Sequence, residues 1–129
     1  MSSKNKGSRA ERELFHMFHK ANFAPIRVAG SGSTTIDSCD LIVGGKGRVL
    51  AIECKSTKKD RKDLRKEQIE ELKNFAKKFG AEPWIAVKFN YLGWFFLSID
   101  NLGKSSGDNP FINKEIAQNK GLSFDELIR

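Results

Sequence analysis

The sequence predicts a single α/β domain, because helical and strand patterns both occur within the length of one domain. Apolar residues recur at helical spacing near the N-terminus and again in the middle of the chain, and strand-like segments follow each of these regions. A chain of 129 residues is long enough to bury a core of its own. We therefore expect one domain over residues 1–129, with residues 1–7 disordered and residues 103–129 weakly patterned.

The two helices are expected over residues 8–22 and 63–79. Their apolar positions are Leu14, Phe15, Phe18 and Ala21 in the first, and Ile69, Leu72, Phe75, Ala76 and Phe79 in the second. Gly80 is placed to end the second helix, because glycine readily adopts the left-handed conformation found at helix C-termini. Further on, Ser123 and Glu126 have the spacing of a capping box, which predicts a short final helix.

Four strands are expected in two pairs. The stretch SCDLIVGGKGRVLAIECKS, residues 38–56, has two apolar strands around a glycine-rich turn, which we place at Gly45 and Lys46. The segments PWIAVKF and GWFFLSI form the second pair and are joined near residues 90–93. The small polar residues of 30–38 and the basic residues of 57–62 predict loops.

The composition favours a protein that binds a polyanion in the cytoplasm. Basic residues number 23 against 16 acidic ones, a net charge of +7, and residues 55–78 alone hold ten Lys or Arg against five Asp or Glu. Charge by itself is equally consistent with solvated helix faces. No apolar run approaches the ~20 residues of a membrane helix. Two cysteines are too few for a disulfide framework, which indicates a reducing compartment.

Charged residues inside the first hairpin indicate a functional site. With the turn placed as above, Asp40 opposes Ala51, and alternate residues of the second strand share its face. Asp40, Glu53 and Lys55 are therefore expected to converge. The residues expected to point the other way, toward the core, are Cys39, Ile52 and Cys54. A shift of one residue in register would separate the charged group.

Two neighbouring carboxylates and a lysine are suited to metal-assisted hydrolysis of a phosphodiester. Such carboxylates repel one another unless a cation lies between them. Mg²⁺ takes one or two protein carboxylates and completes its shell with water and phosphate oxygens. Lys55 would hold the attacking water or the scissile phosphate, and the backbone carbonyl of Cys54 is a further candidate metal ligand. The alternative is a polar surface hairpin with an ordinary ion pair, but the apolar flanks DLIV and VLAIECK favour the catalytic interpretation.

Several segments together resemble the archaeal Holliday-junction resolvases of the PD-(D/E)XK nuclease superfamily. The matching segments are GSRAERELF, RVAGSGS, DLIV, AIECKS, FAKKFGAEPWIAVKF and GWFFLSI, which span residues 7–99 in the family's order. The resemblance implies a central mixed β-sheet flanked by helices, in the restriction-endonuclease-like nuclease fold. It also implies a two-fold homodimer that uses Mg²⁺, with Mn²⁺ as a substitute, to make paired nicks across a four-way DNA junction. No small-molecule cofactor and no membrane association are expected.

The resemblance assigns the centre of the catalytic site to three residues. Asp40 and Glu53 match the metal-binding acids, and Lys55 matches the catalytic lysine. The residue before the first acid is often proline in the superfamily, whereas this chain has Cys39, and Asp37 is a second acid nearby. Asp40 is preferred because it alone leads directly into the apolar run LIV.

Residues outside the hairpin are also implied by the resemblance. Glu11 and Arg12 match an acid and an arginine of the first helix, with Glu11 as a catalytic residue and a further candidate metal ligand. A capping box at the start of that helix is the alternative role for Glu11. Arg27 matches the arginine before the small-residue loop, in which Ser31 and Ser33 are alternatives for an essential serine.

Further DNA contacts are expected from the basic loop and from two isolated polar residues. Lys58, Lys59 and Arg61 provide the positive charge of the loop. Gln68 lies at the edge of the apolar stripe of the second helix, where it is either a site residue or a surface amide. Lys88 interrupts the run WIAVKF and either reaches DNA or protects a strand edge from aggregation.

Aromatic residues provide material for the expected dimer interface. Phe75 and Phe79 lie one turn apart on a strongly charged helix. In GWFF, Trp94 and Phe96 share one face of the strand while Phe95 takes the other. We expect the interface to use residues from this aromatic pool.

The sequence thus predicts a structure-selective, metal-dependent endonuclease that resolves four-way DNA junctions. Two alternatives remain open. One is a repair or restriction-type nuclease that acts on plain duplex, and the other is a non-catalytic DNA-binding paralogue. The complete set of two acids and a lysine argues against the second, because clustered negative charge facing DNA does not favour binding.

Overall fold

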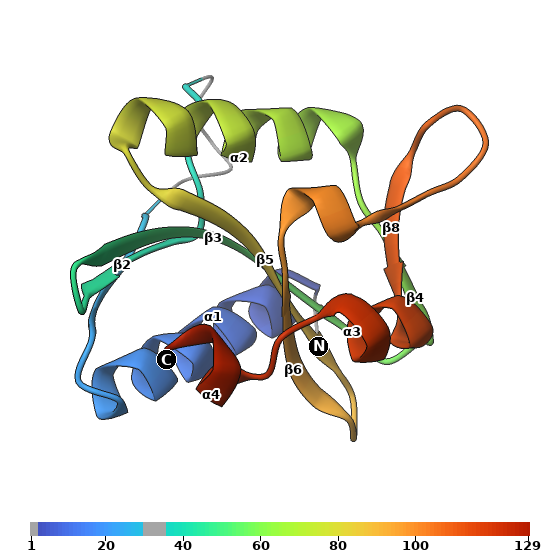
Figure 1. Ribbon diagram of the computed structural model, residues 1–129. Coiled ribbons are helices and arrows are strands. Elements are labelled where there is room, and N and C mark those ends of the chain that lie inside the picture. Colours follow the sequence, from blue (N-terminus) through green and yellow to red (C-terminus); the bar gives the residue numbers. More distant parts are fainter. Residues whose placement is uncertain (1–2, 30–35) are drawn as a thin grey trace.

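The protein, described here by a computed structural model over residues 3–29 and 36–129, is built around two β-sheets (Figure 1). The large sheet has five strands in the order β1-β2-β3-β5-β6, and the small sheet has three in the order β4-β8-β7. The elements in chain order are α1 (Ser3–Lys20), β1 (Ala24–Arg27), β2 (Leu41–Gly45), β3 (Arg48–Thr57), β4 (Arg61–Asp63), α2 (Lys66–Phe79), β5 (Glu82–Phe89), β6 (Gly93–Leu97), the 3-10 helix η1 (Ile99–Asn101), β7 (Gly103–Lys104), β8 (Pro110–Asn113), α3 (Lys114–Lys120) and α4 (Phe124–Leu127).

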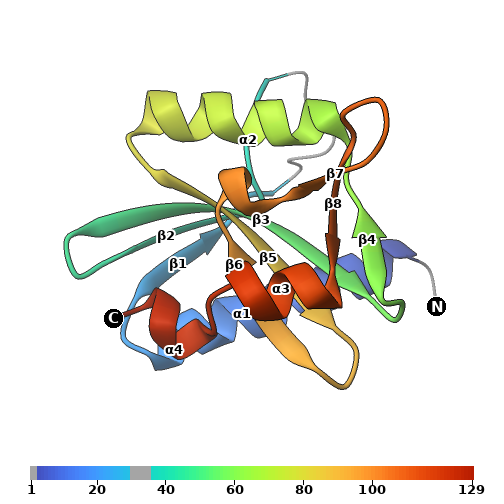
Figure 2. The ribbon, with the colours of Figure 1, turned by 45° about the vertical axis from the view of Figure 1, so that its right-hand side comes forward.

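The large sheet is mixed and carries an apolar core on each face. β3 runs parallel to β5, and the other neighbouring pairs are antiparallel. α2 lies over one face, while α1 and α4 lie over the other (Figures 1 and 2). Members of the α1-side core include Leu14, Phe18, Leu41, Ile52 and Phe96. Members of the α2-side core include Ala51, Leu72, Ala76, Ile85 and Val87. The expected mixed sheet flanked by helices is confirmed.

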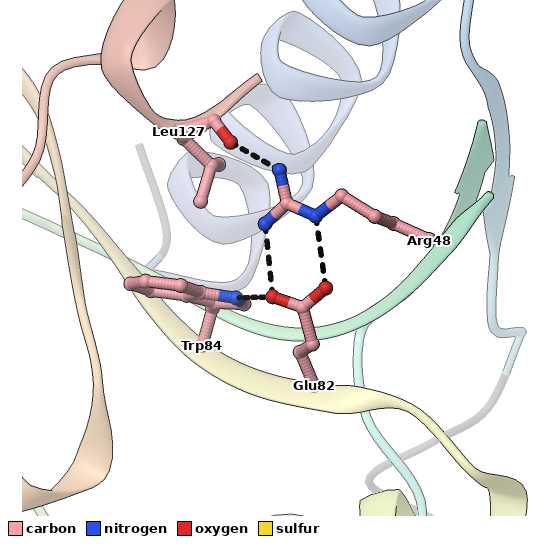
Figure 3. A network of polar contacts seen from close by, with 4 residues as sticks. All are labelled: Arg48, Glu82, Trp84 and Leu127. Atoms are coloured by element: carbon pink, nitrogen blue, oxygen red, sulfur yellow. Dashed lines mark hydrogen bonds and ion pairs between the residues drawn. The ribbon is translucent and has the colours of Figure 1, made fainter. Parts of the chain in front are cut away.

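A polar network around Arg48 binds α4 to the sheet (Figure 3). The Arg48 guanidinium donates two hydrogen bonds to the Glu82 carboxylate, at 2.9 and 2.8 Å, and a third to the Leu127 carbonyl. Trp84 Nε1 donates to the same carboxylate at 3.2 Å. Leu127 is itself buried in the α1-side core, so the network closes that face of the sheet.

The register of the first hairpin differs from the expected one by a shift of its turn. The structure pairs Gly45 with Arg48 and Leu41 with Ile52, which places the two-residue turn at Lys46 and Gly47 rather than at Gly45 and Lys46. Both turn residues have positive φ, 52° and 73°, the conformation that lets a two-residue loop follow the twist of its strands. Because the partner of each residue shifts by two positions, the facing of every side chain is preserved.

The first helix begins earlier than expected. α1 starts at Ser3, so residues 3–7, which we expected to be disordered, are helical. No proline interrupts this segment, and the single Gly7 costs only about 1 kcal/mol in a helix interior. Since the helix is already formed at Ser8, the capping-box alternative for Glu11 is wrong.

The second helix begins later than expected, and the C-terminal region is fully structured. α2 starts at Lys66 rather than at residue 63, because residues 61–63 form a strand that pairs with β8. Gly80 ends α2 with φ 80°, as expected. The predicted capping box is also confirmed, with Ser123 and Glu126 exchanging hydrogen bonds at the start of α4. Residues 103–129 thus add two of the three strands of the small sheet, β7 and β8, and two short helices.

Candidate active site

The first hairpin brings Asp40 and Glu53 together at the end of β2. Leu41 pairs with Ile52, so the preceding Asp40 lies opposite Glu53 in β3. The ladder continues past the strand end, because Asp40 N donates to the Ile52 carbonyl at 3.0 Å. The Asp40 side chain also accepts a 2.8 Å hydrogen bond from the backbone N–H of Cys54. The acid is therefore held in place by the sheet itself.

Glu53 is the buried acid of this pair. The residue is only 7% exposed, the one buried charged residue of the described chain. Burial, then the nearby negative charge of Asp40 and a hydrogen bond between the two carboxyl groups, raise the pKa of Glu53 to about 9. Lys55 opposes this rise, but its effect is smaller. Without a further positive charge, the pair therefore retains a proton at neutral pH.

Lys55 and Gln68 complete the polar group on this face of β3. Lys55 Nζ donates to Gln68 Oε1 at 2.9 Å, and Gln68 Nε2 lies 3.4 Å from Glu53 Oε1. Gln68 is on α2, one helical position before the buried Ile69. The amide thus links the lysine to the buried acid, and the surface-amide alternative for Gln68 is wrong.

Glu11 approaches the same acids from α1. Its carboxylate forms an ion pair with Arg27 at the end of β1, with 3.1 Å between Arg27 Nη2 and Glu11 Oε1. Burial raises the pKa of Glu11, with Asp40 as the next cause, and the hydrogen bond and charge of Arg27 counteract the rise. Three carboxylates therefore influence one another here, and their countercharges are Arg27, Arg12 and Lys55.

The donor set fits a hard divalent cation. Among the described residues, no group of three or more His, Cys, Asp or Glu side chains is arranged to hold a metal ion. Asp40 and Glu53 would therefore bind a cation as a pair, with backbone and water oxygens in the remaining positions, which is the usual coordination of Mg²⁺. A cation bound between the two carboxyl groups would replace the proton that they share and would let both ionise.

One expectation about the faces of β3 needs correction. We expected Cys39, Ile52 and Cys54 on a common core face, opposite a polar face. Ile52 and Cys54 lie in the α1-side core, but Cys39 lies in the α2-side core, where its Sγ donates to the Leu41 carbonyl at 3.1 Å. Cys39 precedes β2, so strand alternation does not apply to it. Both cysteines are buried and free.

The candidate DNA contacts divide into exposed and paired residues. Arg12, Lys58 and Lys59 are exposed, as is Arg61, which stacks on the Phe111 ring at 3.8 Å and pairs with Asp63. Lys88 is half-buried and donates to Glu13 at 2.6 Å. Ser31 and Ser33 lie outside the described residues.

Glu13 is a polar residue of this region that sequence reasoning missed. Its second carboxylate oxygen accepts a 2.9 Å hydrogen bond from Trp94 Nε1. Glu13 lines a pocket of about 190 Å³ together with Arg9, Ala10, Ser56, Thr57, Lys58, Lys88 and Asn90. Residues 56–58 of this lining directly follow Lys55 in the chain. No local signal distinguishes Glu13, because its partners follow it by 75 and 81 residues.

Comparison with known proteins decides the family. The model of the archaeal Holliday junction resolvase family (Hjc) matches residues 2–129. The chain belongs to the archaeal Holliday junction resolvase family. Crossover junction endodeoxyribonuclease Hjc of Methanocaldococcus jannaschii is 38% identical, with 95% of this chain and 96% of the relative covered. Its namesake from Sulfolobus acidocaldarius is also 38% identical, over 100% and 90% of the two chains.

A solved structure of the family has the same fold. Hjc of Archaeoglobus fulgidus, a Holliday junction resolvase, superimposes with a TM-score of 0.88 at 34% identity, covering 95% of this chain and 100% of the other. The expected α/β nuclease fold is thereby confirmed. As a member of the archaeal Holliday junction resolvase family, the protein is an endonuclease of DNA recombination and repair that acts on junction DNA. Within the described residues, the structure has no helix long and apolar enough to cross a membrane.

Proposed function

We propose that the protein resolves four-way junctions with a divalent cation, Mg²⁺ or in its place Mn²⁺, held by Asp40 and Glu53. One observation carries the proposal: an almost fully buried glutamate lies directly against a second carboxyl group. Burying two acids together is unfavourable unless a cation compensates them. When bound there, the cation would supply the charge that lets both acids ionise and would polarise the attacking water and the phosphate oxygens.

Residues of the chain itself would position the reactants. Lys55 Nζ would donate to the attacking water or to a scissile phosphate oxygen. Gln68, already bonded to Lys55 at 2.9 Å, would hold the ammonium group in this orientation. Arg27 would keep Glu11 ionised beside the site through their 3.1 Å ion pair. The Cys54 carbonyl would provide a further ligand of the cation. Arg12, Lys58 and Lys59 would contact the DNA backbone, so that the protein recognises the shape of the junction rather than its base sequence.

We infer further that the protein acts on DNA in the cytoplasm as a two-fold dimer. Resolution requires cuts in two strands, and two sites related by symmetry match the approximate two-fold symmetry of a junction. Within the aromatic pool, Phe96 is fully buried and Trp94 is bonded to Glu13. Phe79 is 54% exposed and stacks on Phe75 with ring centroids 5.3 Å apart on the outer helix α2. The stacked pair is therefore the preferred interface.

Cleavage of a four-way junction and of its component duplex, each with Mg²⁺ and with a chelator, tests the proposal. We expect Mg²⁺-dependent cutting of the junction only. Asp40→Asn and Glu53→Gln should each lower cutting by more than about a thousandfold, because the metal site loses a ligand. Junction binding should persist, since negative charge near phosphates is removed.

Asp37→Asn is the matched control, because it removes an acid three residues from Asp40. It should cut normally. Near-normal cutting by Asp40→Asn, or loss of cutting in Asp37→Asn alone, would reject the assignment. Equal cutting of duplex would favour the duplex-acting alternative.

A further inference from the structure

The tip of the β5–β6 hairpin exposes an aromatic ring completely. Tyr91 has a relative exposure of 101%, and the next residue, Leu92, is 39% exposed. Figures 1 and 2 show this hairpin extending beyond the helices on either side of the sheet. A large ring placed entirely in water contributes nothing to the folded core.

The turn requires a backbone conformation at residue 91 that is unfavourable for tyrosine. Its φ is 67°, in the left-handed region that favours glycine or asparagine. The residue lies within a tight turn closed by a 3.0 Å hydrogen bond from Leu92 N to the Phe89 carbonyl. A bulky residue therefore occupies a position where glycine would be more favourable, without any burial in return. Strain of this kind is typical of functional positions.

Backbone pairing connects the tip of the β5–β6 hairpin to β3, the strand that carries Glu53 and Lys55. Phe89 is fully buried and pairs with both Thr57 of β3 and Gly93 of β6. Asn90 N donates to the Thr57 carbonyl at 3.0 Å. Thr57 follows Lys55 by two residues, which is about 7 Å along a strand. The backbone that carries the ring is thus anchored only a few nucleotide spacings from the candidate active site.

The base of the tip is electropositive. The pocket of about 190 Å³ described above is lined by Arg9, Lys58 and Lys88, and Asn90 of the turn also lines it. Glu13 is the acid among its lining residues, and it is bonded to Lys88. A polyanion bound over the pocket would therefore be placed beside the Tyr91 ring. This charge complementarity favours DNA over a protein as the occupant of the tip.

We propose that Tyr91 stacks on a base exposed at the branch point of the junction and so contributes to selectivity for branched DNA. Every base has a π-face on which an aromatic ring can stack, whatever the sequence. The interior of a plain duplex buries these faces between base pairs, whereas a branch point interrupts the stack. A protein that inserts a side chain between stacked bases of a plain duplex has to unstack them first, which costs free energy. The proposal rests on the junction-directed activity of the family and adds a residue outside the catalytic group.

Binding of Tyr91→Ala and Tyr91→Phe to a four-way junction and to its component duplex tests this proposal. Alanine meets the same backbone strain as tyrosine, so Tyr91→Ala isolates the ring. We expect Tyr91→Ala to bind the junction about 10-fold more weakly, the size of one stacked base, and the duplex with unchanged affinity. Tyr91→Phe should bind the junction like the wild type, because phenylalanine also stacks.

A fluorescent base gives a readout that a purely structural role would not change. A junction carrying 2-aminopurine next to the branch point should lose fluorescence when wild type or Tyr91→Phe binds, but not when Tyr91→Ala binds. Equal weakening toward junction and duplex, or equal quenching by all three proteins, would overturn the proposal. Conversion of Tyr91→Ala to a monomer in sedimentation would also overturn it, because the tip would then be a contact between copies of the chain.

Discussion

Gln68 on α2 accepts a 2.9 Å hydrogen bond from Lys55 on β3, while its amide nitrogen lies 3.4 Å from the buried Glu53. The helix that covers the sheet therefore contributes directly to the polar group at its centre. A lysine ammonium group sits on a flexible four-carbon chain and is easily displaced when a hydrogen-bond partner is removed. The glutamine thus acts as a positioning residue for the lysine.

Removal of the Gln68 amide should slow cleavage without weakening binding. In Gln68→Ala, Lys55 loses its partner, and a small displacement of a reacting group costs about 10- to 100-fold in rate. Junction affinity should remain within about twofold, because the amide carries no charge. Single-turnover cleavage rates at saturating protein measure the effect. The exposed neighbour provides the control variant, Glu67→Ala, and equal rates for the two variants would contradict the role of Gln68.

The metal-free protein should become less stable as pH rises from about 5 to 9. The pKa of Glu53 is raised from 4.5 to about 9, so in this window the folded state binds more protons than the unfolded state. The free energy of unfolding then falls with increasing pH, by at most about 1.4 kcal/mol per pH unit for one proton. Melting temperatures measured in chelator across this range test the effect.

Glu53→Gln should flatten this pH profile, because the amide does not titrate. Glu115→Gln, at an exposed position of α3, should leave it unchanged. Added Mg²⁺ should stabilise the wild type most at high pH, because there the carboxyl groups of the site have fewer protons to release when the metal binds. A wild-type profile as flat as that of Glu53→Gln would mean that Glu53 titrates normally.

Neutralising Glu13 should tighten DNA binding and increase its dependence on salt. Glu13 pairs with Lys88 at 2.6 Å. Burial, the largest influence, raises the pKa of Glu13, but hydrogen bonds from Lys88 and Trp94 outweigh it and lower the pKa overall. In Glu13→Gln, the amide oxygen still accepts a hydrogen bond from Trp94, while the positive charge of Lys88 is no longer balanced by a carboxylate. The slope of log affinity against log salt should become steeper by about one unit.

Fluorescence anisotropy with duplex DNA at several salt concentrations measures this slope. Glu115→Gln changes the net charge equally and serves as the control. If both variants steepen the slope alike, the effect comes from net charge, and Lys88 is not a phosphate contact.

Replacing Phe79 by a charged residue should separate the expected dimer. Phe79 is 54% exposed beside Phe75, so Phe79→Asp should leave the fold intact but place a charge within the interface. Sedimentation should show a monomer, and junction cleavage should yield single nicks rather than paired cuts. Ile26→Asp provides a comparison at another exposed apolar position, 63% exposed on β1. A dimer that survives Phe79→Asp would exclude the stacked pair from the interface.

Strand alternation was the part of the site that the sequence predicted well. The turn lies one residue further along than expected, so Asp40 is opposite Glu53 rather than Ala51. The two acids still share one face of the hairpin, because alternation depends only on odd or even spacing. Likewise, Gly80 ends α2 because its φ of 80° suits glycine, a local requirement that is visible in the sequence.

Contacts between distant segments could not be predicted in this way. Glu13 and Lys88 are 75 residues apart, and only the folded sheet brings α1 to β5. The small sheet was missed because β4 has three residues and β7 has two, too few for a periodic pattern. The burial of Cys39 beneath α2 likewise depends on the path of the chain before β2.

The hydrogen bond from Arg48 to the Leu127 carbonyl has a consequence for synthesis of the protein on the ribosome. Leu14 and Phe18 are made early, but they share their core with Leu127, which is made more than a hundred residues later. Until that residue has emerged, the α1 face of a nascent chain lacks part of its apolar cover and is open to aggregation or chaperones. The last short helix therefore makes completion of this core a late event during translation.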